Sequence, residues 1–500
     1  MKYTRITVLA LAAFCVATAC VQGQDLPKSG PGRAKEKGAG RQGQQGGGAS
    51  PQSFSFHTEV PTHDADIVLC RPTATGVTAS VLVYAGASGQ IHFGLTPEKL
   101  DQQSPVQALT AGEPASIVLD GLMPDQQYFY QFEARSESGQ LLASPPVSSF
   151  HTQRAPGSAF TFAIQADSHL DGATNPAVYL ETLNNEREAK ADFLIDLGDT
   201  FMTDKHPDRE SAHRQYLAQR YYFGQVAHAT PLFLVLGNHD GESGRLAAGP
   251  DSLGVWSNGM RKKYFPNPVP DSFYTGNSAA HAEAGLLENY YAWTWGDALF
   301  VVLDPFWYTG TSNRGPTAFW DRSLGDAQYR WLVQTLSQSK AAHKFVFIHH
   351  LVGGADKNAR GGAEASHFFE WGGHELDGSE AFDARRPGWS EPIHDLMLSL
   401  GVSAVFHGHD HFFMKQERDG VVYQLLPQPG HKGQGSSRSA AEYGYIAGDI
   451  ETGSGYLRVS VRPESATVAF MRTPLSAGGS GASPNAEVAY EYTIPARGAK

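Results

Sequence analysis

The chain has 500 residues, of which 41% are hydrophobic and 18% are charged, and its formal net charge is −12 at pH 7. A chain of this length and composition is expected to form roughly two to four domains with a large hydrophobic core. The negative net charge argues against a surface that coats nucleic acids. It does not exclude an anionic substrate, because a bound cation can reverse the local field.

The N-terminal residues have the pattern of an export signal. Two basic residues precede the apolar stretch Ile6–Ala19, which is too short to span a bilayer. We therefore predict a signal peptide over residues 1–23 and an exported protein, either periplasmic or extracellular. The tetrapeptide Ala17-Thr18-Ala19-Cys20 resembles a bacterial lipoprotein box. Two outcomes remain open: lipidation of Cys20, which would tether the protein to a membrane, or simple cleavage near Ala19 or Gly23.

The next two segments differ in composition. Residues 24–53 are rich in Gly and Gln without apolar periodicity, which is typical of a flexible linker. From residue 54 to residue 153 the pattern changes to short alternating strands separated by Gly- and Ser-rich turns, as in Ser80–Tyr84, Gln90–Phe93 and Tyr128–Phe132. Several strands at this spacing predict a β-sandwich.

Two features of this predicted sandwich indicate structural rather than chemical roles. Cys70 lies in an apolar run, and the chain has only three cysteines, so we expect a core thiol and no disulfide framework. Leu122-Met123-Pro124 followed by Tyr128 resembles the leucine–proline–tyrosine corner of fibronectin type III domains. The resemblance implies that Tyr128 braces the sandwich, which we expect to serve as a scaffold or docking domain.

From residue 158 to residue 496 strands alternate with helical stretches. Ala177–Lys190 and Asp326–Ser339 have helix-like spacing, and Gly455–Pro495 returns to strand alternation. This alternation predicts a layered α/β domain after the all-β sandwich.

Six short apolar runs in this region end in residues of the metal-binding kind. Buried strands have such runs, and open α/β sheets carry their chemistry beyond the carboxyl ends of their strands. The sequence therefore predicts one shared site. The polar segments are Asp167-Ser168-His169, Asp196-Leu197-Gly198-Asp199, Gly237-Asn238-His239-Asp240, Asp304, His349-His350 and His407-Gly408-His409-Asp410-His411.

The residue types in these segments favour transition metals. Asp167 and His169 are two residues apart, as are His409 and His411, and such pairs point to one side of an extended chain, so each pair could bind one centre. Asp, Asn and His together suit Mn, Fe or Zn better than Ca. The set is too large for one tetrahedral ion but suits two ions that share a carboxylate.

Five of these blocks, in this order, resemble the motifs of the calcineurin-like metallophosphoesterases, and the preceding sandwich resembles the N-terminal domain of purple acid phosphatases. The resemblance covers about residues 158 to 495 and implies a four-layer α/β/β/α domain with mixed sheets. The blocks are Asp167-x-His169, Gly198-Asp199, Gly237-Asn238-His239-Asp240, His349 and Gly408-His409-x-His411.

The same resemblance implies a role for each residue. His239 would be a proton donor or charge stabiliser near the leaving-group oxygen, oriented by Asp240. A metal-bridging hydroxide would attack phosphorus in line, without a covalent enzyme intermediate. One metal would be bound by Asp167, His169, Asp199 and His411, and the other by Asp199, Asn238, His349 and His409.

One departure from the purple acid phosphatases concerns the metals. Those enzymes have a Tyr ligand three residues after the Asp of the second block, where this chain has Met202, and the first block supplies His169 instead. We therefore expect no ferric–tyrosinate bond, and two transition-metal ions whose identity (Fe, Mn or Zn) is open.

Several neighbours of these blocks are further candidates. His350 is expected beside the ligands, within reach of substrate, whereas His407 is expected to be structural. Asp304 is expected to sit behind the ligands or to cap a helix. The long segments Gly241–Asn289 and Leu351–Pro392 are expected to wall the pocket. Candidate phosphate contacts within them are Arg245, Lys262, Lys263, Lys357, Arg360, Arg385 and Arg386.

These features predict an exported dinuclear-metal phosphoesterase that hydrolyses small phosphate monoesters. Two alternatives remain open: a phosphodiesterase or nucleotidase that uses the same site, and a non-catalytic, lipid-tethered binding protein. The sequence leaves the oligomeric state undetermined.

Overall fold

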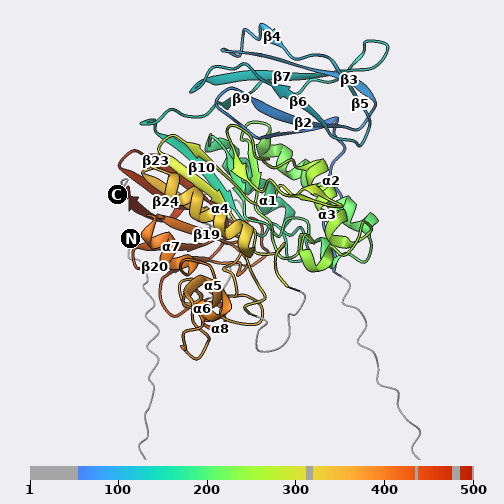
Figure 1. Cartoon of the computed structure of the whole chain (residues 1–500). Helices are drawn as coiled ribbons and strands as arrows, with labels where there is room; N and C mark the ends of the chain where they lie inside the picture. The colour runs from blue at the N-terminus through green and yellow to red at the C-terminus, as the bar shows by residue number, and fades with distance from the viewer. Residues whose placement is uncertain (1–53, 311–318, 434–436, 476–484, 498–500) are drawn as a thin grey trace, which may run out of the picture.

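The computed structural model describes residues 54–310, 319–433, 437–475 and 485–497. The predicted signal peptide, the linker and Cys20 lie outside these residues and stay predictions. The described part of the chain forms a β-sandwich and a larger α/β unit that lie against each other (Figure 1). No helix in these ranges has both the length and the apolar character needed to cross a membrane.

The N-terminal unit is the predicted sandwich of two antiparallel sheets. The first sheet has the order β1-β2-β6, with β1 (Ala65–Cys70), β2 (Val77–Val83) and β6 (Ala115–Leu119). The second has the order β4-β3-β7-β8, with β5 paired to β3 and β9 paired to β7. Its strands are β3 (Ala87–Gly94), β4 (Gln102–Gln103), β5 (Gln107–Leu109), β7 (Gln127–Arg135), β8 (Leu141–Ala143) and β9 (Ser148–His151).

The bracing contact of Tyr128 and the buried position of the Cys70 thiol are confirmed. The Tyr128 hydroxyl accepts a hydrogen bond of 2.9 Å from the Met123 N–H, as a tyrosine corner requires. Cys70 is a free, buried thiol whose pKa is raised by burial to about 12, so it stays protonated and unreactive.

The α/β unit has two mixed sheets packed face to face. The first has the order β12-β11-β10-β23-β24-β25, and the second has the order β13-β16-β17-β18-β19-β21-β20-β22. The first comprises β10 (Phe160–Gln165), β11 (Leu194–Asp196), β12 (Leu232–Leu234), β23 (Ser454–Arg462), β24 (Ser465–Thr473) and β25 (Glu487–Pro495). The second comprises β13 (Thr275–Gly276), β16 (Tyr291–Trp295), β17 (Ala298–Val302), β18 (His343–Phe347), β19 (Ala404–His407), β20 (Phe413–Arg418), β21 (Val421–Leu425) and β22 (Asp449–Glu451).

Helices cover the outer face of each sheet, which confirms the predicted α/β/β/α layers. The central core joins apolar residues of both sheets, such as Phe162 and Phe347. Side chains of α1 and α2 pack on the first sheet, and those of α4, α5 and α7 pack on the second. The helices are α1 (Pro176–Glu188), α2 (Arg209–Ala227), α3 (Leu253–Tyr264), α4 (Gly325–Gln338), α5 (Phe369–Gly372), α6 (Phe382–Arg385), α7 (Ile393–Ser399) and α8 (Ser437–Glu442).

The remaining elements are short and lie in the connections. Two strands form a separate hairpin, β14 (Ala280–His281) and β15 (Gly285–Leu286). The 3-10 turns are η1 (Thr203–Lys205), η2 (Gly244–Leu246) and η3 (Ala365–His367).

A buried arginine joins the two units. Arg220 of α2 has no exposed side-chain surface, and its guanidinium donates to the Ser80 hydroxyl, to the Ser80 and Asp66 carbonyls of the sandwich and to the Tyr264 carbonyl. Val68 and Leu82 of the sandwich belong to the same apolar cluster as residues of α2. The sandwich is therefore docked through a continuous core rather than attached by a loose linker.

We predict that Arg220→Met lowers the free energy of unfolding by about 3 kcal/mol or more, because it leaves several buried acceptors without donors. The control is Arg187→Met, since Arg187 pairs at the surface with exposed Glu188, and it should cost less than about 0.5 kcal/mol. Urea and thermal unfolding measure both variants. Equal losses would show that Arg220 does not hold the interface.

Candidate metal centre

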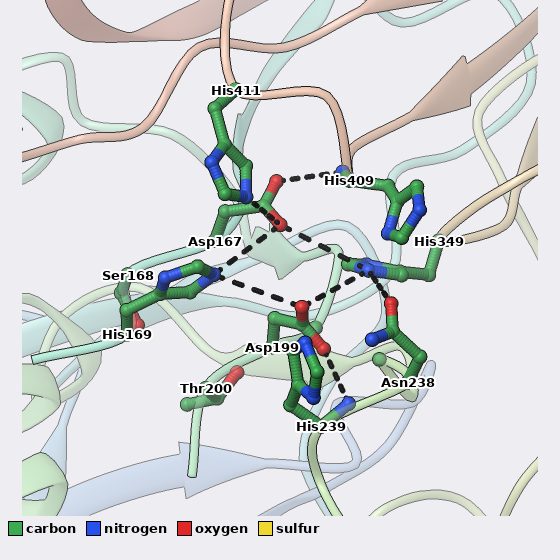
Figure 2. A network of polar contacts seen from close by, with 12 residues as sticks. Asp167, Ser168, His169, Asp199, Thr200, Asn238, His239, His349, His409 and His411 are labelled. Carbon is green, nitrogen blue, oxygen red and sulfur yellow. Dashed lines mark hydrogen bonds and ion pairs between the residues drawn. The ribbon is translucent and has the colours of Figure 1, made fainter. Parts of the chain in front are cut away.

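The predicted ligands converge where parallel strands of both sheets end (Figure 2). In the first sheet β10, β11 and β12 are parallel, and in the second sheet β18 and β19 are parallel. The segments after these five strands supply every predicted ligand. They are Asp167 and His169 after β10, Asp199 after β11, Asn238 after β12, His349 after β18, and His409 and His411 after β19.

Six of these residues form two groups that could each hold a metal ion. Within each group the ligand atoms all lie within 4.8 Å of one another. The groups are Asp167 with His169 and His411, and Asp199 with His349 and His409.

In the first group two buried atoms have no hydrogen-bond partner. Asp167 Oδ1 and His169 Nε2 are both buried and unpartnered among the described residues. Asp167 Oδ1 lies 3.4 Å from His411 Nε2 and 3.7 Å from His169 Nε2. The other Asp167 oxygen accepts a hydrogen bond of 2.9 Å from the His409 N–H. Unsatisfied buried atoms are costly, and a cation between them removes the cost.

In the second group the tautomer of His349 exposes a lone pair to the centre. Its Nδ1 donates to the Leu197 carbonyl at 2.8 Å, so in the neutral ring Nε2 carries no proton. That Nε2 lies 3.1 Å from Asn238 Oδ1 and 3.4 Å from Asp199 Oδ2, so three electron-rich atoms face one another. His409 donates from Nε2 to the Asn358 carbonyl, which leaves Nδ1 for the centre. These donors fit a transition-metal ion.

One oxygen of Asp199 faces both groups. Asp199 Oδ2 lies 3.4 Å from His349 Nε2 and 3.7 Å from His169 Nε2. The other oxygen, Oδ1, accepts a hydrogen bond of 2.7 Å from the His239 N–H, which fixes the carboxylate plane. This is the geometry that a carboxylate shared between two ions needs.

Close backbone contact between two glycines brings these loops together. Gly198 has φ +95°, and a Cβ there would lie 2.3 Å from the Gly237 nitrogen. A Cβ at Gly237 would lie 2.0 Å from the Asp199 nitrogen. Any side chain at either position would push the Asp199 and Asn238 loops apart.

The spacing argument, by which His409 and His411 could bind one centre, was wrong, and the two residues join different groups, as the family resemblance implied. The reason is that the ligand segments are not extended. Five ligands have φ values in the left-handed region, which bulky residues rarely adopt unless the surroundings impose it. These residues are Asp167 (59°), His169 (50°), Asp199 (54°), His409 (79°) and His411 (66°).

The electrostatics of the centre favour positive charge. Burial by itself raises the pKa of Asp167 and Asp199, but nearby imidazoles, first those of His411 and His349, hold both pKa values below their usual range. Burial lowers the pKa of His349, yet Asp199 more than offsets this and raises it to about 9. Despite the same effect of burial, nearby carboxylates also raise the pKa of His169. Without an ion, protons would therefore be drawn onto His169 and His349, and a bound cation can take their place.

The expected orientation of His239 by Asp240 was wrong, because Asp204 orients it. Asp204 Oδ1 lies 3.0 Å from His239 Nδ1. Asp240 is buried and turned away, and it braces the loop after β11. Its oxygens accept hydrogen bonds from the backbone N–H groups of Asp199, Thr200, Phe201 and Gly237.

A cavity of about 400 Å³ opens over the two groups. His350 lies in its wall, and burial together with the charges of His409 and His349 keeps the pKa of His350 well below its usual range. Asp304 does not line the cavity. It accepts hydrogen bonds from the N–H groups of Phe306 and Trp307, so it caps a turn.

His407 and Met202 lie outside both groups. His407 is buried at the end of β19, and burial lowers its pKa to about 3, which is consistent with a structural role. Met202 is buried and precedes η1 in a left-handed conformation.

Of the basic candidates, only Arg245, Lys357 and Arg360 line the cavity. The other four pair elsewhere: Lys262 donates to the Ala284 and Leu286 carbonyls, Lys263 pairs with Glu113, Arg385 with Glu375 and Arg386 with Glu370. All seven candidates were predicted from their position in long loops. That position does not reveal which residues line the cavity and which stabilise the loop itself.

Four residues that support the site were not predicted, because their roles depend on tertiary contacts. Asp204 lies far in sequence from His239, which it contacts, and Arg322 lies far from the Gly353 carbonyl to which it donates. Asn358 accepts from His409 through its backbone carbonyl, and Gln428 donates from Nε2 to the Asp167 carbonyl. A lone carboxylate five residues after Asp199 was the only signal for Asp204.

We predict two metal equivalents per chain, about one in His169→Ala and fewer than one in Asp199→Ala, because a single Asp199 oxygen lies within 3.7 Å of a histidine of each group. Elemental analysis after gel filtration measures this, with His92→Ala of the sandwich as the control. Retention of two equivalents by Asp199→Ala would show that the carboxylate is not shared.

The sequence matches the family described as "Calcineurin-like phosphoesterase" over residues 160–413, just over half of the chain. The solved structure of PhoD is similar in fold, with a TM-score of 0.61 and 16% identity over 89% of this chain and 91% of that one. A purple acid phosphatase, PPD1 from seeds of yellow lupin (Lupinus luteus), gives a TM-score of 0.56 and 13% identity over 86% and 74%. Identities this low show the fold alone.

A search of curated proteins found no match. The family match covers the segments that carry all seven predicted ligands, from Asp167 to His411. The chain therefore belongs to the calcineurin-like phosphoesterase family.

Proposed function

We propose that this protein is an exported enzyme that hydrolyses small phosphate monoesters at a pair of metal ions. The observation that carries the proposal is the single Asp199 oxygen that faces both ligand groups. Family membership supplies the reaction class, a metal-dependent cleavage of phosphoesters. Similarity in fold to a purple acid phosphatase favours monoesters.

Two ions, once bound, would neutralise phosphoryl charge and activate a water for in-line attack without a covalent enzyme intermediate. With the carboxylates of Asp167 and Asp199 ionised, two divalent ions would leave a formal local charge near +2, which attracts phosphate into a negatively charged protein. One ion would be held by Asp167, His169, Asp199 and His411, and the other by Asp199, Asn238, His349 and His409.

We assign His239 to the leaving group. Its ring lines the cavity beside the ligands, and its Nδ1 is held by Asp204, so Nε2 is the atom free to act. A proton on Nε2 could be delivered to the departing oxygen or could stabilise its charge. Asp204 is a positioning residue that fixes the ring while it does so.

A phosphodiesterase or nucleotidase is the second candidate. The cavity is larger than a phosphate group needs, and Pro305 and Phe306 give part of its wall an apolar surface that suits a second ester substituent. The ratio of kcat/KM for a nitrophenyl monoester and a bis-nitrophenyl diester decides between the two. A non-catalytic binding protein is disfavoured by family membership and by the two ligand groups.

We predict that His239→Ala lowers kcat for an alkyl phosphate about 10²- to 10⁴-fold, and for p-nitrophenyl phosphate much less, because a good leaving group needs little proton donation. Asp204→Asn should act in the same direction but more weakly. Asp251→Asn, on an exposed loop, is the control. Steady-state kinetics on both substrates, with metal content checked, provide the measurement. Equal losses on the two substrates would remove His239 from the leaving group.

Export is also testable. Expressed with its full N-terminus in a Gram-negative bacterium, the protein should be recovered outside the cytoplasm and shortened by about 19–23 residues. Mass spectrometry of the N-terminus, labelled palmitate and Cys20→Ser distinguish a lipid-modified Cys20 from simple cleavage. An uncleaved cytoplasmic product would contradict export.

A further inference from the structure

The cavity wall beyond the metal ligands is strongly basic. Among the described residues it includes four cationic side chains, and Asp199 is the only carboxylate that lines the cavity. This asymmetry is notable in a chain whose formal net charge is −12. The four cations are Arg245, Arg322, Lys357 and Arg360.

Two of these four cations are already engaged within the protein. Arg322 donates to the Gly353 carbonyl at 2.7 Å and to the Asp356 carbonyl at 3.2 Å, so it holds the following loop in place. Arg360 lies 3.8 Å from the centroid of the Tyr443 ring, and its Nε lies 3.8 Å from Asp410 Oδ1. Both guanidinium groups therefore already interact with other parts of the protein.

Lys357 is presented by a well-defined loop. Asp356 Oδ1 accepts hydrogen bonds from the N–H groups of Asn358 (2.8 Å) and Arg360 (3.1 Å), and the Asn358 carbonyl accepts from His409. The loop is thus tied to a metal ligand at one point and to Arg322 at another. The exposed ammonium of Lys357 has no hydrogen bond or ion pair within the described part of the chain.

Arg245 is presented from another segment of the wall. It lies in η2, which is held against the backbone of the opposite segment, because a Cβ at Gly244 would lie 2.0 Å from the Trp307 carbonyl oxygen. Arg245 is exposed and has no hydrogen bond or ion pair with any residue that the structure describes. Its guanidinium is therefore available to a ligand in the cavity.

The metal pair already supplies the positive charge that a scissile phosphate needs. Two further unpartnered cations on the same wall repel each other and the ions unless an anion joins them. An Arg fork and a Lys ammonium are the groups that proteins use for phosphate oxygens. A cavity of about 400 Å³ has room for more than one phosphate.

We propose that the preferred substrates carry a second phosphate on the leaving group and that Arg245 and Lys357 bind it. This inference rests on the proposed function, since it names the substrate class of the same site. The second phosphate stays intact while the first is hydrolysed, and it mainly adds binding and orientation.

The test compares butyl phosphate with the bisphosphates of ethane-, butane- and hexanediol, with phosphate release measured on the metal-replete enzyme. At least one bisphosphate should exceed butyl phosphate in kcat/KM by about tenfold or more, beyond the twofold statistical factor. If no ester is hydrolysed, the proposed function fails. If butyl phosphate is hydrolysed and no bisphosphate is preferred, only this inference is overturned.

Charge-neutral variants locate the effect. Arg245→Gln and Lys357→Gln should each reduce the preference for the best bisphosphate about tenfold, while kcat/KM for butyl phosphate falls no more than about threefold. Lys340→Gln removes one exposed charge away from the cavity and should change neither value. A preference that survives both cavity variants would assign the second phosphate to other residues and overturn the proposal.

Discussion

Two buried carboxylates lie opposite the lone pairs of histidine and amide side chains. Positive charge between them is needed to stabilise this arrangement. Asp167 Oδ1 and His169 Nε2 are buried without a hydrogen-bond partner in the part of the chain that the structure describes, and the Leu197 carbonyl fixes His349 so that the lone pair of its neutral ring points inward. Such an arrangement would be costly in a protein core without bound charge. The roles that we propose for the basic cavity wall and for His239, which are phosphate binding and stabilisation of the leaving group, both depend on metal ions at this centre.

Binding the ions requires ligands from both sheets, so the fold must bring the two sheets together. The first sheet supplies Asp167, His169, Asp199 and Asn238, and the second supplies His349, His409 and His411. Each group in the structure contains residues from both sheets, so neither sheet can build even one site alone. The aromatic core between the sheets, which includes Phe162 and Phe347, therefore also sets the distance between ligands.

The sandwich is connected to the centre through α2. On one face of this helix Arg220 binds sandwich carbonyls. On another, Gln215 donates to the His169 and Thr200 carbonyls, and Gln219 donates to the Ser168 hydroxyl and the Thr200 carbonyl. One helix thus holds both the docked sandwich and the loops that carry ligands. This gives the N-terminal unit a supporting role for the site beyond that of a spacer.

Sequence reasoning predicted what depends on local pattern. Buried strands were identified from apolar runs, and their ends met because parallel strands end at the same edge of a sheet. The helices predicted at Ala177–Lys190 and Asp326–Ser339 appear as α1 and α4 within two residues at either end. The separation of His409 from His411 was implied by the family resemblance but not by strand alternation, because it depends on left-handed backbone conformations that the packed loops impose. Asp204 was missed for a similar reason, since only the tertiary fold brings it to His239.

The presence of two metal ions that share Asp199 can be tested with a crystal structure and anomalous scattering collected at the Mn, Fe and Zn edges. We expect two anomalous peaks about 3.5–4 Å apart. One peak should lie beside Asp167, His169 and His411, the other beside Asn238, His349 and His409, with Asp199 bound to both. A single peak in the fully loaded protein, or two peaks without Asp199 between them, would contradict this expectation.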